Sequence, residues 1–153
     1  MRNPCRTRGS RLHRRERRHR RERGAAAVEF ALIFGFLLVP LTMGLLEYGW
    51  YFYTSQVTGS ATRETARRLS VGDCTASGKA QAYARQTSGF KDLTLTFGTP
   101  AAQNNTQPPV GDVMRVTATT NGALFTFLPL PNGGQVIREV DSRVEDTTED
   151  TAC

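Results

Sequence analysis

The sequence predicts an α+β fold: a long N-terminal transmembrane helix continues into an exposed helix, followed by a short helix and a small antiparallel β-sheet. Residues 25–46 form an apolar run of membrane length. Residues 54–69 keep helical spacing of their apolar side chains, and from residue 93 onward apolar residues alternate with polar ones, as in half-buried strands. At 153 residues, the chain has room for one modest domain beside its membrane segment.

Residues 1–24 form a basic leader. Residues 1–23 contain eleven arginines and two glutamates, a net charge of +9 with both histidines neutral. With almost no apolar side chains, this arm cannot bury a core, so we expect it to be disordered in water. Positive flanks stay on the cytoplasmic side of a membrane, which places the N-terminus in the cytoplasm and everything after Tyr53 outside. The predicted location is therefore the cytoplasmic membrane, crossed once.

The charge of the remaining chain argues against a nucleic-acid partner. The whole sequence has a net charge of +6, but residues 25–153 carry nine basic and twelve acidic groups, a net charge of −3. A basic surface is what nucleic-acid binding requires, and here the positive charge is confined to one terminal arm. The sequence therefore predicts no nucleic-acid binding.

Residues 25–53 are predicted to be a transmembrane helix with an aromatic interface. The apolar run of residues 25–46 is close to the ~20 residues that cross the hydrocarbon. Four tyrosine, tryptophan and phenylalanine residues within 50–53 join Tyr48 in a belt typical of a membrane–water interface. Pro40 should kink this helix without ending it. The alternative is a cleaved secretory signal, but its apolar region is usually only ~7–15 residues long and ends at a small-x-small site.

Residues 54–144 are predicted to form an extracytoplasmic α+β domain. The helix over 54–69 should end at Val71-Gly72-Asp73, because glycine suits a helix C-terminus. A short helix is expected at 78–87, a loop at 100–111 and a turn at 132–134, with strands at 93–97, 113–119 and 136–144. Residues 124–130 are apolar and, with prolines at 129 and 131, should be an edge strand or a packed loop. Residues 145–153 form an acidic tail.

Two carboxylates flank the apolar run. Glu29 is the only charge between residues 28 and 46, and a lone carboxylate inside an apolar segment is costly enough to need a reason. Glu47 lies eighteen residues later, five ideal turns at ~3.6 residues each, so both would share a face of a straight helix. The simpler interpretation of Glu47 is a carboxylate among interfacial aromatic residues.

Small residues recur every fourth position at Ala27, Ala31 and Gly35, the spacing that lets membrane helices approach closely. Ordinary alanine and glycine content of a membrane span explains this stripe equally well. The stripe therefore favours self-association only weakly.

The cysteines and histidines limit the chemistry available. Cys74 and Cys153 both fall outside, in an oxidising compartment, and form a natural disulfide pair. Two free thiols or a metal-binding pair are the alternatives. Because both histidines lie in the leader, the rest of the chain cannot build a Ser–His pair or a Cys/His zinc site. The acidic residues after 140 lack the spacing of a calcium loop. The sequence predicts no enzyme, no cofactor and no metal site.

The junction Gly24-Ala25-Ala26-Ala27-Val28-Glu29-Phe30 resembles the processing site of type IVb prepilins, and the chain resembles the TadE-like family of minor pseudopilins of the Tad (Flp) pilus. Further resemblance lies in Gly44-Leu45-Leu46-Glu47-Tyr48-Gly49, in residues 61–67 and 114–119, and in the Pro-rich residues 127–131. Thr62 and Thr65 depart from the family, where small Ala or Gly is usual, so this helix could pack differently. The resemblance implies a pilin-like, single-pass protein that acts in pilus assembly.

The resemblance also implies how the junction is used. A prepilin peptidase would cut after Gly24, leaving Ala25 as the new N-terminus and Glu29 as the fifth residue, with Phe30 fitting the Tad-type subset. The new α-amine, with a pKa of about 7.7–8, could pair with Glu29 of a neighbouring subunit and set their register. The expected partners are the membrane, the prepilin peptidase, other pilin-like subunits and Tad assembly proteins.

A different class of protein fits the same residues. A single-pass anchored binding domain would keep its leader, Gly24 would simply end the basic arm, and Glu29 would snorkel to the interface. Removal of the leader distinguishes the two hypotheses, because only the pseudopilin requires it.

Overall fold

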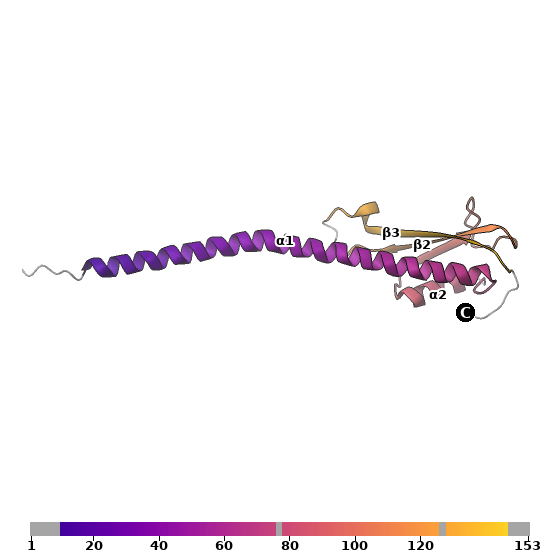
Figure 1. The fold of residues 1–153 in the computed structure, drawn as a ribbon, viewed down its shortest axis with the longest axis horizontal. Helices are drawn as coiled ribbons and strands as arrows, with labels where there is room; N and C mark the ends of the chain where they lie inside the picture. The colour runs from indigo at the N-terminus through magenta and orange to yellow at the C-terminus, as the bar shows by residue number, and fades with distance from the viewer. Residues whose placement is uncertain (1–9, 76–77, 126–127, 147–153) are drawn as a thin grey trace, which may run out of the picture. The chain divides into compact units, whose positions relative to one another are not determined.

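The computed structural model describes residues 10–75, 78–125 and 128–146, with side chains from residue 24 onward. The elements in chain order are α1 (Ser10–Ser70), α2 (Lys79–Ser88), β1 (Thr94–Gly98), β2 (Val113–Asn121), the 3-10 turn η1 (Pro131–Gly134) and β3 (Gln135–Arg143) (Figure 1). The predicted α+β class and the order of its elements are confirmed. The chain divides into two compact units, residues 1–44 and 45–153, which are described separately.

Helix α1 is longer than predicted at its N-terminal end. It runs without interruption through the apolar run, the aromatic belt and residues 54–69, and Pro40 lies inside it without ending it. The expectation of disorder is wrong for residues 10–23, which are helical. These residues include no glycine or proline and are mostly arginine, leucine and glutamate, all good helix formers. Residues 1–9 lie outside the described part of the chain.

Both helices of the second unit end at glycines in the left-handed conformation. Gly72, with φ of 88°, follows α1, and the Asp73 amide donates to the Arg68 carbonyl at 3.0 Å. Gly89, with φ of 76°, follows α2 in the same way. Because a side chain at such a φ is strained, glycine fixes both end points, as the sequence predicted for Gly72.

A polar contact joins α1 to α2. The Tyr83 hydroxyl donates to Glu64 Oε1 at 3.4 Å, and Arg68 Nε donates to the same oxygen at 3.2 Å. The Arg68 guanidinium also lies 4.5 Å from the centre of the Tyr83 ring, within range of a cation–π interaction. Glu64 of α1 therefore accepts hydrogen bonds from Arg68 of the same helix and from Tyr83 of α2. The contacts with Tyr83 hold α2 against α1.

The strands form a three-stranded antiparallel sheet in the order β1-β2-β3. Phe97 of β1 is opposite Val116 of β2, and Val116 is opposite Val140 of β3. Strand β2 extends two residues beyond the predicted 113–119. Of the predicted edge strand or packed loop at 124–130, the described residues form a loop, and the predicted turn at 132–134 lies in η1.

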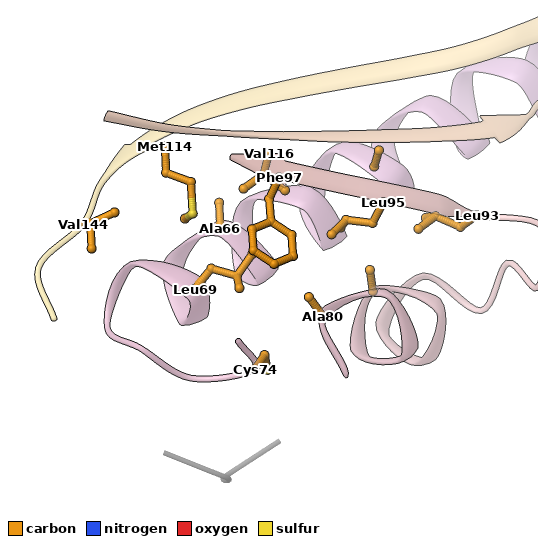
Figure 2. Packing of buried hydrophobic residues seen from close by; sticks show 12 residues of the cluster. Ala66, Leu69, Cys74, Ala80, Leu93, Leu95, Phe97, Met114, Val116 and Val144 are labelled. Atoms are coloured by element: carbon orange, nitrogen blue, oxygen red, sulfur yellow. The ribbon is translucent and has the colours of Figure 1, made fainter. Parts of the chain in front are cut away.

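The core lies between the sheet and the C-terminal part of α1, with α2 closing one side. In Figure 2, Leu95, Phe97 and Met114 extend from the strands toward the helices, and Leu93 lies just before β1. The buried cluster comprises Ala66, Leu69, Cys74, Ala80, Ala84, Leu93, Leu95, Phe97, Met114, Val116, Ala118 and Val144. Alternate residues of β1 and β2 supply the sheet's side chains to this cluster, which is the pattern predicted for half-buried strands.

Threonines cover much of the α1 surface that is buried in the second unit. Thr54, Thr58, Thr62 and Thr65 are all fully buried. The Thr62 hydroxyl donates to the Thr58 carbonyl at 2.6 Å and the Thr65 hydroxyl donates to the Ala61 carbonyl at 2.8 Å. These back-bonds satisfy the hydroxyls of Thr62 and Thr65 within the helix, whereas the hydroxyls of Thr54 and Thr58 have no partner among the described residues. Thr62 and Thr65 therefore serve as small, largely apolar residues in this contact.

The face of the sheet that is away from the core carries an exposed ion pair. Arg115 Nε and Nη2 donate to the two carboxylate oxygens of Asp141 at 2.7 and 2.8 Å, and Glu139 lies 3.8 Å from the same guanidinium. The hydrogen bonds from Arg115 lower the pKa of the Asp141 carboxyl. The pair connects neighbouring strands, but solvent exposure leaves its contribution to stability small.

Candidate functional site

The predicted processing and register residues lie in the first unit on an open stretch of α1. Gly24, Ala25, Glu29 and Phe30 are all exposed. Among the described residues, no hydrogen bond or ion pair joins the Glu29 carboxylate to another group of this chain. The Phe30 ring stacks on that of Phe34 with centroids 5.8 Å apart. The structure thus leaves the Glu29 carboxylate available to a group from outside the chain.

The predicted packing stripe lies on the same stretch of helix. Ala27 and Ala31 are exposed and Gly35 is half-buried. A Cβ atom built at Gly35 would meet no atom within 4 Å. Residues four apart lie on one side of a helix, so the three small residues leave a shallow, unfilled strip along α1.

The two cysteines of the predicted pair differ in what the structure shows of them. Cys74 is buried, at 1% exposure, at the end of the turn that follows α1. Cys153 lies outside the described residues, so the pairing stays a prediction. The described chain approaches the same place, because the amides of Glu145 and Asp146 donate to the Ser70 carbonyl at 2.7 and 3.1 Å.

Glu47 has a role that the sequence did not indicate. Its side chain is fully buried, at 0% exposure, although it follows the apolar run directly. Glu47 Oε1 accepts a hydrogen bond from the Leu124 amide at 3.1 Å, and Oε2 accepts one from the Phe125 amide at 2.8 Å. The interpretation as a carboxylate among interfacial aromatic residues is therefore wrong. Glu47 therefore holds the loop at residues 124–125 against α1, although this loop lies 77 residues later in the chain.

The loop after β2, residues 121–125, is held by further contacts. The Gly122 amide donates to the Gly134 carbonyl at 2.8 Å, and the Ala123 amide donates to Asn121 Oδ1 at 3.0 Å. A Cβ on Gly122 would lie 2.9 Å from Val136 Cγ2 and 3.1 Å from Tyr51 Cδ2, so only glycine lets the loop approach α1 this closely. With the two bonds to Glu47, all four amides from 122 to 125 have acceptors.

Two more contacts tie this end of the domain to α1. The Tyr48 hydroxyl donates to the Pro129 carbonyl at 3.0 Å. Arg138 of β3 reaches Ser55, where its Nε donates to the Ser55 carbonyl at 3.3 Å and its Nη2 donates to the Ser55 hydroxyl. A Cβ built on Gly59, one turn later, would lie 3.9 Å from the Arg138 side chain, so this part of α1 lies alongside the Arg138 stem. The sheet therefore contacts α1 through polar groups here and through the apolar core farther along.

The side chains of this arrangement can position the loop against α1 and can present an open helix surface to a partner. Among the described residues, no group of three or more His, Cys, Asp or Glu side chains could hold a metal ion. The Glu47 carboxylate holds two backbone amides in place. One helix of the described chain, Gly24–Ser70, is long and apolar enough to cross a membrane, which is consistent with a single span.

Sequence reasoning found the exposed site residues and missed the buried ones. One stretch of α1 carries Ala27, Glu29, Ala31 and Gly35. Their spacing along the helix is therefore enough to place them together. Glu47 and Arg138 act through contacts with residues some 80 positions away, and no local pattern marks such a pair. A usable signal was that Glu47 stands at the end of an apolar run where nothing nearby in the sequence could neutralise it.

The comparisons with known proteins agree with this architecture. Residues 24–67 match the family model described as TadE-like protein. The match begins at the proposed processing glycine and ends in the part of α1 that packs against the sheet. Among curated proteins and among solved structures, nothing matches the chain.

Glu47→Gln should loosen the loop at residues 124–125. A glutamine keeps one carbonyl acceptor and turns an NH₂ group toward the other amide, and a buried amide without an acceptor costs about 1–3 kcal/mol. We expect hydrogen exchange at the Leu124 and Phe125 amides to accelerate about tenfold or more. The measurement is hydrogen–deuterium exchange on the full chain in detergent micelles.

Glu29→Gln is the matched control, because it removes the other carboxylate of the same helix from an exposed position. It should leave exchange at residues 124–125 unchanged. Equal exchange in the native protein and Glu47→Gln would show that Glu47 does not hold the loop.

Proposed function

We propose that this chain is a minor pseudopilin of the Tad (Flp) pilus, because its residues 24–67 match the family model described as TadE-like protein. Its leader is removed by a prepilin peptidase, and it acts in pilus assembly by associating with other pilin-like subunits through its N-terminal helix. The family match carries this proposal, because it covers the processing junction, the apolar segment and the start of the packed helix. Members of this family are generally structural and non-enzymatic.

The charge distribution supports the proposed orientation in the membrane. Eleven arginines precede residue 24, and basic flanks remain cytoplasmic. The domain of residues 54–144 would then lie outside the cytoplasmic membrane, with residues 145–153 as its tail. Processing on the cytoplasmic side would remove the leader from a chain already anchored by residues 25–53.

The open surface of α1 supports helix-mediated association. Glu29 is exposed and has no partner among the described residues, and Ala27, Ala31 and Gly35 leave an unfilled strip beside it. Cleavage after Gly24 would create an α-amine one helical turn before Glu29, in the low-dielectric part of the same segment. An amine and a carboxylate from neighbouring subunits would neutralise each other there and fix the axial register of the two helices.

We also infer that Cys74 and Cys153 form a disulfide. The chain at Asp146 is bonded to the end of α1 through Ser70, and seven residues at ~3.3 Å each give Cys153 ample reach back to Cys74. The proposed outside location is oxidising, which favours a bridge. Such a bridge would hold the end of the chain against the turn after α1.

Leader removal is the first test of the proposed function. The protein should be made with an active Tad prepilin peptidase, extracted from membranes and analysed by intact mass and N-terminal sequencing. We expect a chain that begins at Ala25. Gly24→Leu should keep the leader, because a bulky side chain replaces the glycine at the cut, whereas Gly9→Leu, inside the leader, should be cleaved normally.

Two other outcomes of this test have definite meanings. An intact leader in the presence of active peptidase would favour a membrane-anchored binding domain. A chain that begins after Tyr53 would identify the apolar run as a cleaved secretory signal.

Glu29→Gln should weaken association between processed subunits. Removing one partner of a buried ion pair leaves the other charge uncompensated, at a cost of about 3 kcal/mol or more, or about a hundredfold in an association constant. The measurement is site-directed cross-linking between copies in native membranes, with processing checked by mass. Glu64→Gln, on the packed part of α1, is the control, and equal cross-linking in all three proteins would exclude the pairing.

The disulfide predicts a specific pattern of thiol labelling. In protein from the membrane, Cys74 and Cys153 should react with maleimide only after reduction, and Cys74→Ser should make Cys153 reactive without it. The loop between the two cysteines corresponds to about 4 kcal/mol on the chain-entropy model, so reduction should lower the thermal midpoint. Cys5 in unprocessed chains is an internal positive control. Labelling of both outer cysteines before reduction would exclude the bridge.

A further inference from the structure

An apolar hollow opens beside the loop that Glu47 holds. It is lined by Leu45, Leu46, Gly49, Trp50 and Tyr53 of α1 and by Leu124 of the loop. Leu45 and Leu46 are 77% and 59% exposed, and Leu124 is 47% exposed. Large apolar side chains gathered on a surface mark a place that another apolar phase or partner covers. The loop thus adds a side chain from the outer domain to the apolar surface of the helix.

The backbone N–H groups of this loop already have partners inside the protein, as a medium without water requires of them. Non-helical backbone tolerates membrane depth only where its polar groups have partners inside the protein. The amides of residues 122–125 all have acceptors, two of them the oxygens of Glu47. The two hydrogen bonds to Glu47 also offset part of the free-energy cost of burying its carboxylate.

The composition of the loop favours lipid over a protein partner. No charged residue occurs between Val116 and Ile137, so no side chain of the loop opposes entry into an apolar layer. Trp50 and Tyr53, which line the hollow, are residue types that prefer the membrane–water interface. Leu45 and Leu46 are the last residues of the apolar run, so the hollow directly continues the segment assigned to the membrane.

We propose that the loop of residues 121–125 and the helix surface of residues 45–53 form one lipid-contacting face. It lies at the boundary between the phospholipid headgroups and the acyl chains of the leaflet at this end of the span. The outer domain would then be held against the membrane at a second point, and Glu47 is the positioning residue that keeps the loop there. This inference rests on the membrane span of the proposed function.

The single tryptophan of the chain makes the test direct. The full-length protein is reconstituted into vesicles of phosphatidylcholine and phosphatidylglycerol, with phosphatidylcholine brominated near the top of its acyl chains as the quencher. Native Trp50 reports on the helix. The double variant Trp50→Phe, Leu124→Trp reports on the loop, and Trp50→Phe, Val110→Trp is the control, because Val110 is 57% exposed in a loop bonded at Gly111 to Val144.

We expect the tryptophan introduced at position 124 to lose intensity with brominated lipid to an extent comparable with Trp50, and to resist aqueous iodide. The tryptophan at position 110 should show the reverse. Adding Glu47→Gln to the Leu124→Trp protein should increase iodide quenching, because the loop loses one of its two bonds to α1.

Three results would overturn the inference, and they separate it from the proposed function. If position 124 is quenched by iodide as strongly as position 110 while Trp50 is still quenched by lipid, the loop faces water and the span stands. If position 124 resists both quenchers and cross-links to a second copy, a protein covers the hollow. If Trp50 also escapes lipid quenching and the chain does not float with vesicles, the membrane span itself fails.

Discussion

One helix has to serve two environments, and the rest of the fold follows from how its surface changes along its length. Between Val28 and Leu46 most side chains of α1 are large, apolar and exposed. From Thr54 to Ser70 the surface buried in the second unit is made mainly of threonine, serine, alanine and glycine, with Leu69 as its one large side chain. Small side chains let a sheet approach a helix closely. The hydroxyls of Thr62 and Thr65 are bonded back to the helix, whereas those of Thr54 and Thr58 have no hydrogen-bond partner among the described residues. The change in side-chain size therefore marks where the chain's own sheet can pack.

One buried carboxylate, that of Glu47, lies on α1 between these two surfaces. Glu47 stands where the apolar residues end and accepts two consecutive amides of a loop that contains no charged residue. Burying a carboxylate requires compensation, and two hydrogen bonds to its charged oxygens supply it. Glu29 is the opposite case, because its carboxylate lies open on the same helix. Identical residue types at the two ends of the apolar run thus have different tasks, one inside the subunit and one, as we propose, between subunits.

The elements that depend on local pattern could be predicted from the sequence. Both helices, all three strands and the turn at Asn132-Gly133-Gly134 follow from periodicity and from glycine, whose effects extend over a few residues. The helix over residues 10–23 does not follow from apolar content, which is low there; it follows from good helix formers next to a long helix. Glu47 and Arg138 could not be assigned, because their partners lie 77 to 83 residues away and the fold alone brings them together.

The division of α1 also restricts where partners can bind. From Thr54 to Leu69 the small-residue surface is already covered by the chain's own sheet and core. A neighbouring subunit could use that surface only by displacing packed side chains, which a folded core resists because each buried residue has several partners. The open strip at Ala27, Ala31 and Gly35 needs no such displacement. The proposed association through residues 25–44 would therefore leave the outer domain intact, so that one part of the helix would serve assembly while the other serves folding.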